Sequence, residues 1–482
     1  MRTRRLVPPL LLLPALALAA GGAPAVLPIT TSSPEARALY LEGRDLVERL
    51  KGTEAHLKTD QAVKKDPQFA LAWLQWAQTS GTAKDFLTGM DKAVATAPKA
   101  SEAEQMFIRA AEAGARSRPA EQDKLLAALA EKFPSDPRIF NQIGIVAFGK
   151  QDYDGAIRAL SRAVELDPKF TLPYNQLGYA YRAQGKNAEA EKIFKKYAEL
   201  LPDDPNPHDS YAELLMRLGR FDESITNYKK ALKIDPNFVS ADVGIANNQV
   251  FQGKGDDARA TLKGLLAKAR NNGEKRLAWF WTSETYLHEE RWADALKSLE
   301  EEKKIADASG DLVSASQDLN FMGNILLAAG KPADAAQKFE ESLKTIERSK
   351  AADAVKEAAH RAHLFDMARV ALAKGDLGTA RSTAASYSRA VEAKAVPFEV
   401  RQSHELAGMI AVQAKEWDSA LSELGKAGQQ NPRVMYFTGL AWQGKGDSTK
   451  AAEAFRSAVD YNQLNGVYGL VRPQARRQLG RS

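Results

Sequence analysis

The side chains that could carry out chemistry in this chain are six histidines and many carboxylates. His360 and His363 lie one helical turn apart, which is a spacing of metal ligands, but no further histidine or cysteine stands beside them. No His-Glu-x-x-His, Gly-x-Ser-x-Gly, Ser-x-x-Lys or Gly-x-x-x-x-Gly-Lys-Ser/Thr motif occurs. The carboxylates are typical of solvated helix faces with Glu/Lys pairs rather than of an acid/base couple. We therefore predict no catalytic site, cofactor or metal, and we expect that the protein is not an enzyme.

The elements available to position a binding site are helices. Strong helix formers dominate the composition, and runs of β-branched residues are nearly absent. A chain of 482 residues exceeds the size of one hydrophobic core, so it must form several domains or a repeat array. A 34-residue period favours the array. Its markers are Pro134, Pro168, Pro202 and Pro236, with Gly185, Gly219 and Gly253.

Each 34-residue block predicts a pair of packed helices. In the block that begins at Pro137, apolar residues follow the spacing of one helix face, and a second apolar face follows. The first face is Phe140, Ile143, Gly144 and Ala147, and the second is Ala156, Leu160 and Ala163. Asp167-Pro168 should end the second helix, because a helix rarely continues through the residue before a proline.

The next block carries the residues of a known family. They are Tyr174, Leu177, Gly178, Tyr181, Ala190, Phe194 and Pro202. This pattern of large, small and aromatic residues resembles the tetratricopeptide repeat, in which small side chains let two helices approach and large ones fill the adjoining space. The resemblance implies an all-α fold, a right-handed solenoid of antiparallel helix pairs.

The resemblance covers nearly all of the chain with varying regularity. We expect degenerate repeats over 36–136, regular ones over 137–272, and longer, divergent ones over 273–465, with a seam at Asn271 to Gly273. The equivalent residues Ala295, Ala335, Ala380 and Ala420 are 40, 45 and 40 residues apart, which predicts longer helices or connections there. Residues 24–35 are expected to be a linker, and 466–482 a solvated, frayed basic tail.

Residues 1–23 are typical of a secretory signal peptide. Arg2, Arg4 and Arg5 precede an apolar run over 10–20 that is too short to span a bilayer. Small residues suitable for cleavage follow. The absence of cysteine excludes a lipid-modified cysteine after cleavage and a disulfide framework. We expect an exported bacterial protein, periplasmic or secreted, without stable membrane insertion after cleavage.

The charge gives no reason to expect nucleic acid as a partner. Three of the 67 basic residues lie in the signal segment, which leaves 64 basic against 61 acidic residues, a net charge of +3. This small excess is spread along the chain. The oligomeric state is not indicated by the sequence.

The resemblance implies that the first helix of each repeat lines a concave groove that binds a protein or an extended peptide. Carried over by position, the groove residues are Asn141, Phe148, Asn175, Tyr179, Arg182, Asp209, Glu213, Met216, Asn247, Phe280, Glu284, Asn320, Asn324, Phe365, Arg369, Met409 and Tyr436. The asparagines are suited to pairing with a peptide backbone, although they are equally typical of a wet helix face. Asp209 and Glu213 stand where capture of an acidic motif would need basic residues.

Three functions stay open at this point. The leading hypothesis is an exported scaffold or adaptor that holds a protein segment in the groove. The second is a non-catalytic accessory subunit of an envelope enzyme, secretion or signalling complex, bound by its convex face or termini. The third is an enzyme whose site lies in the less regular stretches, which no motif supports.

Overall fold

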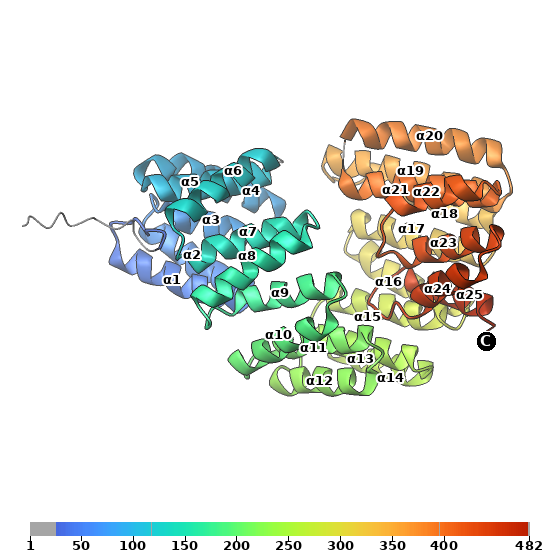
Figure 1. Cartoon of the computed structure of the whole chain (residues 1–482), viewed down its shortest axis with the longest axis horizontal. Helices are drawn as coiled ribbons and strands as arrows, with labels where there is room; N and C mark the ends of the chain where they lie inside the picture. The colour runs from blue at the N-terminus through green and yellow to red at the C-terminus, as the bar shows by residue number, and fades with distance from the viewer. Residues whose placement is uncertain (1–25, 117, 395, 481–482) are drawn as a thin grey trace, which may run out of the picture. The chain divides into compact units, whose positions relative to one another are not determined.

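The structure, a computed structural model of the whole chain, describes residues 26–116, 118–394 and 396–480. In this part of the chain all regular elements are helices, 25 α-helices and one 3-10 helix, and there is no strand. The predicted all-α solenoid of helix pairs is confirmed (Figure 1). The predicted signal peptide lies outside the described residues.

Unit 1 comprises residues 1–200 and unit 2 residues 201–482. The helices of unit 1 are α1 (Pro34–Glu48), α2 (Gly52–Lys65), α3 (Ala70–Gln78), α4 (Ala83–Thr96), η1 (Ala97–Lys99), α5 (Glu102–Ala115), α6 (Pro119–Lys132), α7 (Pro137–Gly149), α8 (Tyr153–Leu166), α9 (Leu172–Ala183) and α10 (Asn187–Leu200). Those of unit 2 are α11 (Pro205–Arg217), α12 (Phe221–Ile234), α13 (Val239–Phe251), α14 (Gly255–Lys268), α15 (Asn272–Leu287), α16 (Trp292–Ala308), α17 (Leu312–Ala328), α18 (Pro332–Glu347), α19 (Asp353–Ala373), α20 (Leu377–Lys394), α21 (Pro397–Gln413), α22 (Trp417–Lys426), α23 (Pro432–Gly444), α24 (Ser448–Val459) and α25 (Tyr468–Gln478).

The division between the units lies within the regular repeats and not at the seam expected near residues 271–273. At that seam Asn271 only caps a helix, because its Oδ1 accepts from the backbone N–H of Glu274 at 2.9 Å. The expectation of longer helices in the second half is correct, since α16 to α21 contain 16 to 21 residues each, against 12 to 14 in α7 to α14.

Helices pair where a glycine of one faces a large side chain of the next. A Cβ atom added at Gly178 would lie 2.5 Å from the ring of Phe194, and one added at Gly439 would lie 2.5 Å from Phe455. Because the glycine has no side chain, the two helix axes approach closely and the ring fills the space beside them. The small and large residues of the sequence pattern therefore meet as predicted.

The turns also follow the sequence. Gly185, Gly219 and Gly253 have φ angles of 74°, 73° and 79°, the left-handed conformation that a glycine at a helix C-terminus adopts readily. Helix α8 ends at Leu166, directly before Asp167-Pro168.

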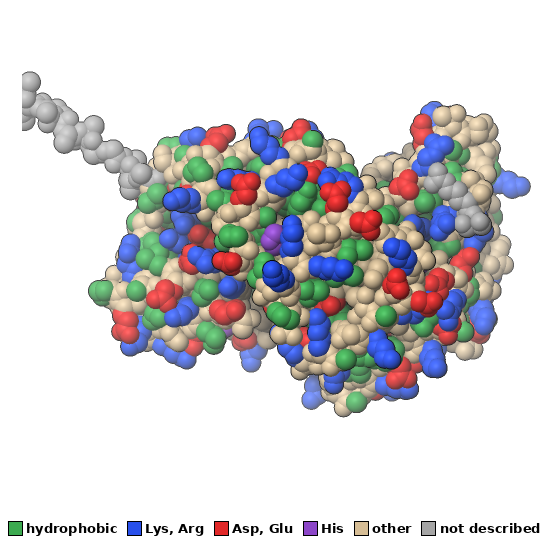
Figure 2. All heavy atoms as spheres, turned by 90° about the horizontal axis from the view of Figure 1, so that it is seen from below, with side chains coloured by type: hydrophobic (Ala, Val, Ile, Leu, Met, Phe, Trp, Pro, Cys, Tyr) green, Lys and Arg blue, Asp and Glu red, His purple; other side chains and the backbone are tan. Residues whose placement is uncertain are grey.

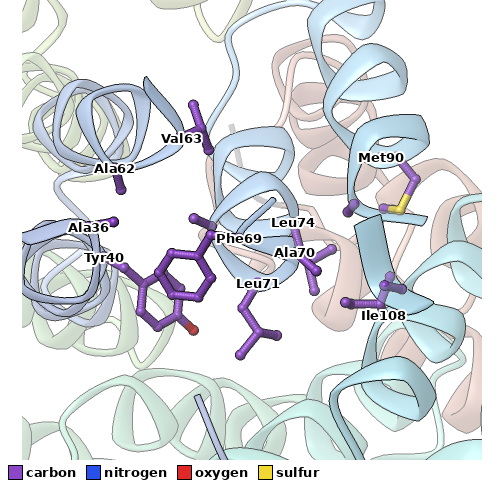
Figure 3. Close-up of a cluster of buried hydrophobic side chains, with 13 residues drawn as sticks. Ala36, Tyr40, Ala62, Val63, Phe69, Ala70, Leu71, Leu74, Met90 and Ile108 are labelled. Atoms are coloured by element: carbon purple, nitrogen blue, oxygen red, sulfur yellow. The ribbon is translucent and has the colours of Figure 1, made fainter. Parts of the chain in front are cut away.

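Unit 1 has its largest core cluster at its N-terminal end. Tyr40 of α1 and Phe69, which precedes α3, lie with their ring centroids 5.0 Å apart (Figure 3). Ala62, Met90 and Ile108 from α2, α4 and α5 belong to the same cluster. The repeats that look degenerate in the sequence thus share one continuous core with their neighbours.

Candidate functional site

A groove of about 760 Å³ lies within unit 1, and we call it the unit-1 groove. Helices α1, α3, α5 and α7 contribute its walls, so first helices of successive repeats line it as the resemblance implies. Its apolar lining includes Leu71, Phe107 and Ile139, and its polar lining includes Gln75 and Asn141. A groove of this size and composition accommodates a short stretch of extended polypeptide.

Two buried amides in the wall of this groove are incompletely paired. Gln75 is 6% exposed and Asn141 is 5% exposed. Gln75 Nε2, a donor, and Asn141 Oδ1, an acceptor, have no hydrogen-bond partner in the protein. A buried polar atom without a partner costs about 1–3 kcal/mol. Both atoms are enclosed by protein atoms, and Gln75 Nε2 lies against Gly43, so a ligand in the groove reaches them only when these side chains turn towards it.

Sequence reasoning identified Asn141 and missed Gln75. Both Asp66-Pro67-Gln68-Phe69 and Asp167-Pro168-Lys169-Phe170 open a repeat. When these two stretches are aligned, Gln75 takes the position of Gln176, next to the predicted groove residue Asn175. The alignment places Leu74, and not Gln75, at the position of Asn175, so it gave no signal for Gln75.

The mouth of the unit-1 groove carries two guanidinium groups around one carboxylate. Arg138 Nη2 donates to Glu48 Oε1 at 2.8 Å, and Arg44 Nε lies 3.8 Å from the same oxygen. Burial and the charge of Arg138 lower the pKa of Arg44, and burial raises the pKa of Tyr40 to about 12. The Thr171 hydroxyl donates to the carbonyl of Glu48 at 3.1 Å, so residues more than 100 positions apart close this end of the groove.

We call residues 26–33 the strap, and residues 26–29 of it line the unit-1 groove. The backbone N–H of Leu27 donates to Asp136 Oδ2 at 2.6 Å, and that of Thr30 donates to Glu104 Oε1 at 2.8 Å. The Thr31 hydroxyl donates to Asp66 Oδ2 at 2.5 Å. The prediction of a linker over 24–35 is therefore wrong for the strap, because carboxylates at the starts of three repeats hold it.

The predicted groove residues of unit 1 do not all reach this groove. Asn141 lines it, whereas Phe148, Asn175, Tyr179 and Arg182 do not. The ring of Phe148 packs against Tyr153 at 5.5 Å, and Arg182 lies over the ring of Tyr179 at 4.5 Å. Binding through these four residues stays a prediction.

The C-terminal segment changes the concave surface of unit 2. Residues 466–482 were expected to be a frayed tail, which is wrong, because 468–478 form α25 and Tyr468, Leu470 and Val471 are buried. Tyr468 packs on Phe251 of α13, and Leu470 joins a cluster with α15 and α17. The burial of apolar side chains outweighs the tendency of a chain end to fray.

Several predicted groove residues of unit 2 lie beneath or beside α25. Glu284 is buried under Gly469, and Phe280 contacts Gly466. A residual cavity of about 220 Å³ remains between α25 and the first helices of the last repeats. The predicted residues that line this cavity are Asn324, Arg369, Met409 and Tyr436.

The asparagines of unit 2 are used within the protein. Asn320 Nδ2 donates to Asp366 Oδ2 at 2.6 Å, and Arg369 donates to Asn324 Oδ1 at 2.6 Å. Asn247 Nδ2 donates to the carbonyl of Val243 at 2.9 Å. The hypothesis that asparagines await a peptide backbone therefore keeps its support at Asn141 and loses it at these positions.

The other predicted residues of unit 2 are largely packed inside it. Met216 belongs to a buried cluster with α13 and α14, and Phe365 to one with α20 and α21. Burial, together with the charge of Glu213, raises the pKa of Asp209 to about 8. These positions do not form an open groove.

A second cavity in unit 2, of about 610 Å³, is lined by residues of α15 to α19 and of α21, among them the predicted groove residues Phe280 and Asn320. Phe398 at its edge is 60% exposed. At its base Arg276 donates to both oxygens of Asp318, at 2.7 and 2.8 Å, and lies 3.1 Å from Glu302. Burial and the charge of Asp318 raise the pKa of Glu302 to about 8.

No group of three or more possible metal ligands gathers among residues 26–116, 118–394 and 396–480. His360 lies 3.1 Å from Glu347, and His363 lies 3.5 Å from Glu340. Within the same described ranges, no helix has both the length and the apolar character needed to cross a bilayer. Basic and acidic side chains are both spread over the face of the molecule shown in Figure 2.

Comparison with known proteins decides the nature of the repeats. Two models of the tetratricopeptide repeat match, one over residues 147–214 and 215–279 and the other over residues 99–170. Together these matches extend over residues 99–279. The family resemblance read from the sequence is thus confirmed for these residues, and the same paired-helix architecture extends over the rest of the described chain.

Relatives share the tetratricopeptide repeats over part of their length. "Protein STIP1 homolog" of Dictyostelium discoideum is 35% identical over 128 residues, which are 27% of this chain and 23% of that protein. "TPR repeat-containing protein YpiA" of Bacillus subtilis is 26% identical over 166 residues, 34% of this chain and 38% of that protein. A solved tetratricopeptide repeat protein of Parabacteroides merdae has a TM-score of 0.36 at 13% identity and covers 55% of this chain and 98% of its own. The chain therefore spans less than two fifths of the length of either relative.

Proposed function

We propose that this protein is an exported, non-catalytic scaffold or adaptor that binds an extended segment of another protein in the unit-1 groove. Tetratricopeptide-repeat proteins generally mediate protein–protein interaction, and both family models that match are models of this repeat. Export to a bacterial periplasm rests on the signal-like residues 1–23 and on the absence of cysteine.

The observation that carries the proposal is the unit-1 groove itself, whose largely apolar wall includes two amide side chains, Gln75 and Asn141, that each keep one unpaired polar atom. Turned towards the groove, Gln75 Nε2 donates to a carbonyl oxygen of a peptide and Asn141 Oδ1 accepts from an N–H. An extended peptide presents both groups along its backbone, whatever its sequence. The strap shows that this end of unit 1 already holds extended chain through backbone N–H groups.

A variant that replaces both amides by apolar side chains of similar size, Q75M/N141L, tests the proposal. The probe is the peptide that binds best when an array of unstructured 12-residue peptides is screened against the full chain. We expect the double substitution to weaken its binding at least tenfold, because two hydrogen bonds to the peptide backbone are lost. The fold of unit 1 should become as stable or more stable, since two unpaired buried atoms are removed.

Asn247→Leu is the matched control, because Asn247 is also a buried asparagine on the first helix of a repeat but already has a partner within unit 2. It should cost stability and leave peptide binding unchanged. Unaltered peptide affinity in Q75M/N141L, with the variant folded, would show that the groove does not hold the peptide through these amides.

A further inference from the structure

The cavity of about 610 Å³ in unit 2, which we call the Glu302 cavity, is bordered by small side chains of α19. Ala358, Ala359 and Ala362 line it together with Leu343 and Ile346 of α18. Alanines leave space that larger side chains at these positions would fill. A cavity of this volume accommodates a small organic molecule.

Aromatic and exposed apolar side chains suit the Glu302 cavity to an apolar body. Phe280, Phe321 and Phe339 line it, from three different helices. At its edge Phe398 and Val355 are 60% and 44% exposed. An apolar ligand would remove these side chains from water, and the faces of aromatic rings also attract a cation.

The polar end of the cavity has one guanidinium for two buried acids. Arg276 donates to both oxygens of Asp318 and, at 3.1 Å, to the backbone carbonyl of Glu302. Its Nη2 also lies 3.1 Å from Glu302 Oε1. Glu302 is only 5% exposed, yet its Oε2 has no hydrogen-bond partner. When both acids are ionised, one negative charge is therefore left without a counter-charge.

The other ionisable side chains that line the cavity have partners of their own. Glu399 pairs with Arg361 at 2.8 Å, and His363 lies 3.5 Å from Glu340. The missing positive charge is therefore at Glu302.

In the protein alone a proton offsets this missing charge. Burial and the charge of Asp318 raise the pKa of Glu302 to about 8, so this carboxyl keeps a proton at neutral pH. Glu302 Oε2 is enclosed by protein atoms, and a cation in the cavity meets it when the side chain turns away from Asp318. An ammonium group brings a full positive charge and three N–H donors, which is what the ionised Glu302 lacks.

We infer that the Glu302 cavity binds a small amphiphilic amine, whose ammonium group takes the place of the proton at Glu302 and whose apolar body lies among the phenylalanines. The ligand is a small molecule and not a protein segment, because a lysine side chain carries the ammonium without a bulky apolar body. The cavity lies within unit 2, so this inference is independent of the unit-1 groove.

The first experiment compares three probes with the same apolar body: phenylbutylamine, phenylbutanol and phenylbutyrate. Calorimetric titration of the full chain at pH 8 should show that the amine binds at least about tenfold more tightly than the alcohol, because only the amine forms a buried charge pair. The acid should bind most weakly. N-acetyl-lysine methylamide, an ammonium without the apolar body, should bind at least about tenfold more weakly than phenylbutylamine.

The second experiment changes the acid. Glu302→Gln should weaken the binding of phenylbutylamine at least about tenfold and leave that of phenylbutanol unchanged. Glu405→Gln is the matched control, because Glu405 is also a buried glutamate of unit 2 but pairs with Arg433 outside the cavity. It should leave the binding of both probes unchanged.

The third experiment fills the cavity. Ala359→Phe places a ring in the space that the probes need, and it should abolish the binding of all of them. Ala362→Phe should do the same from an exposed position, where the added ring costs the fold little.

The pH dependence of binding gives a further readout. Because the amine displaces a proton from Glu302, its affinity should rise from pH 6 to pH 8 by up to about tenfold per pH unit, whereas that of phenylbutanol should stay constant. The charged groups that act on Glu302 are Arg276 of α15 and Asp318 of α17. Glu302→Gln keeps both of them and His363, so a flat profile in this variant assigns the rise to Glu302.

Four results would overturn the inference: equal affinity for the amine and the alcohol, amine binding unchanged in Glu302→Gln, amine binding retained in the folded alanine variants, or equally tight binding of the lysine derivative. The last result would make a lysine side chain of a protein the ligand. Q75M/N141L should bind phenylbutylamine as the wild type does, which separates this inference from the proposed function.

Discussion

Unit 1 and unit 2 are both covered on their concave surface by a segment of their own chain, but the covers differ. The strap over unit 1 is extended and leaves a groove of about 760 Å³ beside it. Helix α25 over unit 2 leaves about 220 Å³. The strap is held by backbone N–H groups and hydroxyls on carboxylates, whereas α25 is held by buried side chains.

The difference follows from backbone hydrogen bonding. An extended segment must donate its backbone N–H groups to another part of the protein. In the strap, Asp136 and Glu104 accept them at the starts of repeats. A helix satisfies its own backbone and offers only side chains, so it fills the surface that it covers. One repeat architecture thus presents an open groove suited to extended chain and a closed surface suited to a helix.

The largest expected effect on stability comes from a substitution in α25. Tyr468 is 1% exposed and packs on Phe251 and His288, so Tyr468→Ala should lower the free energy of unfolding of unit 2 by about 4 kcal/mol. Hydrogen exchange followed by mass spectrometry would measure this for each unit separately. Unit 1 should keep its protection.

Tyr468→Phe is the control for that prediction. It keeps the ring and removes the hydroxyl, which donates to the carbonyl of Val459, so its cost should be about 1 kcal/mol. A loss in Tyr468→Ala no greater than in Tyr468→Phe would mean that α25 contributes little to the packing of unit 2.

A smaller effect is expected from pH. The pKa of Glu302 in the folded protein is about 8, above its ordinary value of 4.5, so the folded chain retains a proton that the unfolded chain releases. Its contribution to stability is complete below pH 4.5 and is lost as the pH rises to about 8. Between pH 6 and 8 the stability of unit 2 should fall by up to about 3 kcal/mol because of Glu302.

Glu302→Gln removes this titration and serves as the comparison. Asp209 also has a raised pKa, of about 8, and its titration acts in the same direction. The lowered pKa of His288 affects stability only as the pH falls below 6.5. Both contributions are the same in the wild type and in Glu302→Gln. Denaturant unfolding from pH 6 to 8 should show a shallower slope in the variant. Parallel slopes would show that Glu302 is already ionised at neutral pH.

The sequence predicts contacts within a repeat better than contacts between repeats far apart in the sequence. Gly178 and Phe194 are 16 residues apart and recur with the period, so their packing was readable. Arg472 and Phe251 are 221 residues apart, and no periodic signal connects them. The helices, their pairing and the left-handed glycine turns were therefore predictable, whereas the two covers were not.

The candidate site shows the same limit. The family pattern places a residue on the first helix, but it does not say which segment of the chain will lie over it. Asn141 faces an open groove, whereas Glu284, chosen by the same rule, lies under α25. Exposure depended on the course of the terminal segments, whose composition suggested a linker and a frayed tail.

The smallest expected effect on stability comes from releasing the strap. This prediction tests whether the strap depends on single carboxylates. Glu104 is 0% exposed and accepts from the N–H and hydroxyl of Thr30 and from the N–H of Ser101. Glu104→Ala should release the strap and lower the stability of unit 1 by about 2 kcal/mol, because these hydrogen bonds to a charged group are lost. Glu112→Ala on the same helix removes ion pairs with Arg116 and Arg118 and should cost less than about 1 kcal/mol. Amide exchange over residues 26–33 should accelerate only in Glu104→Ala; if it stays slow, side-chain packing holds the strap as it holds α25, and the contrast between the two covers disappears.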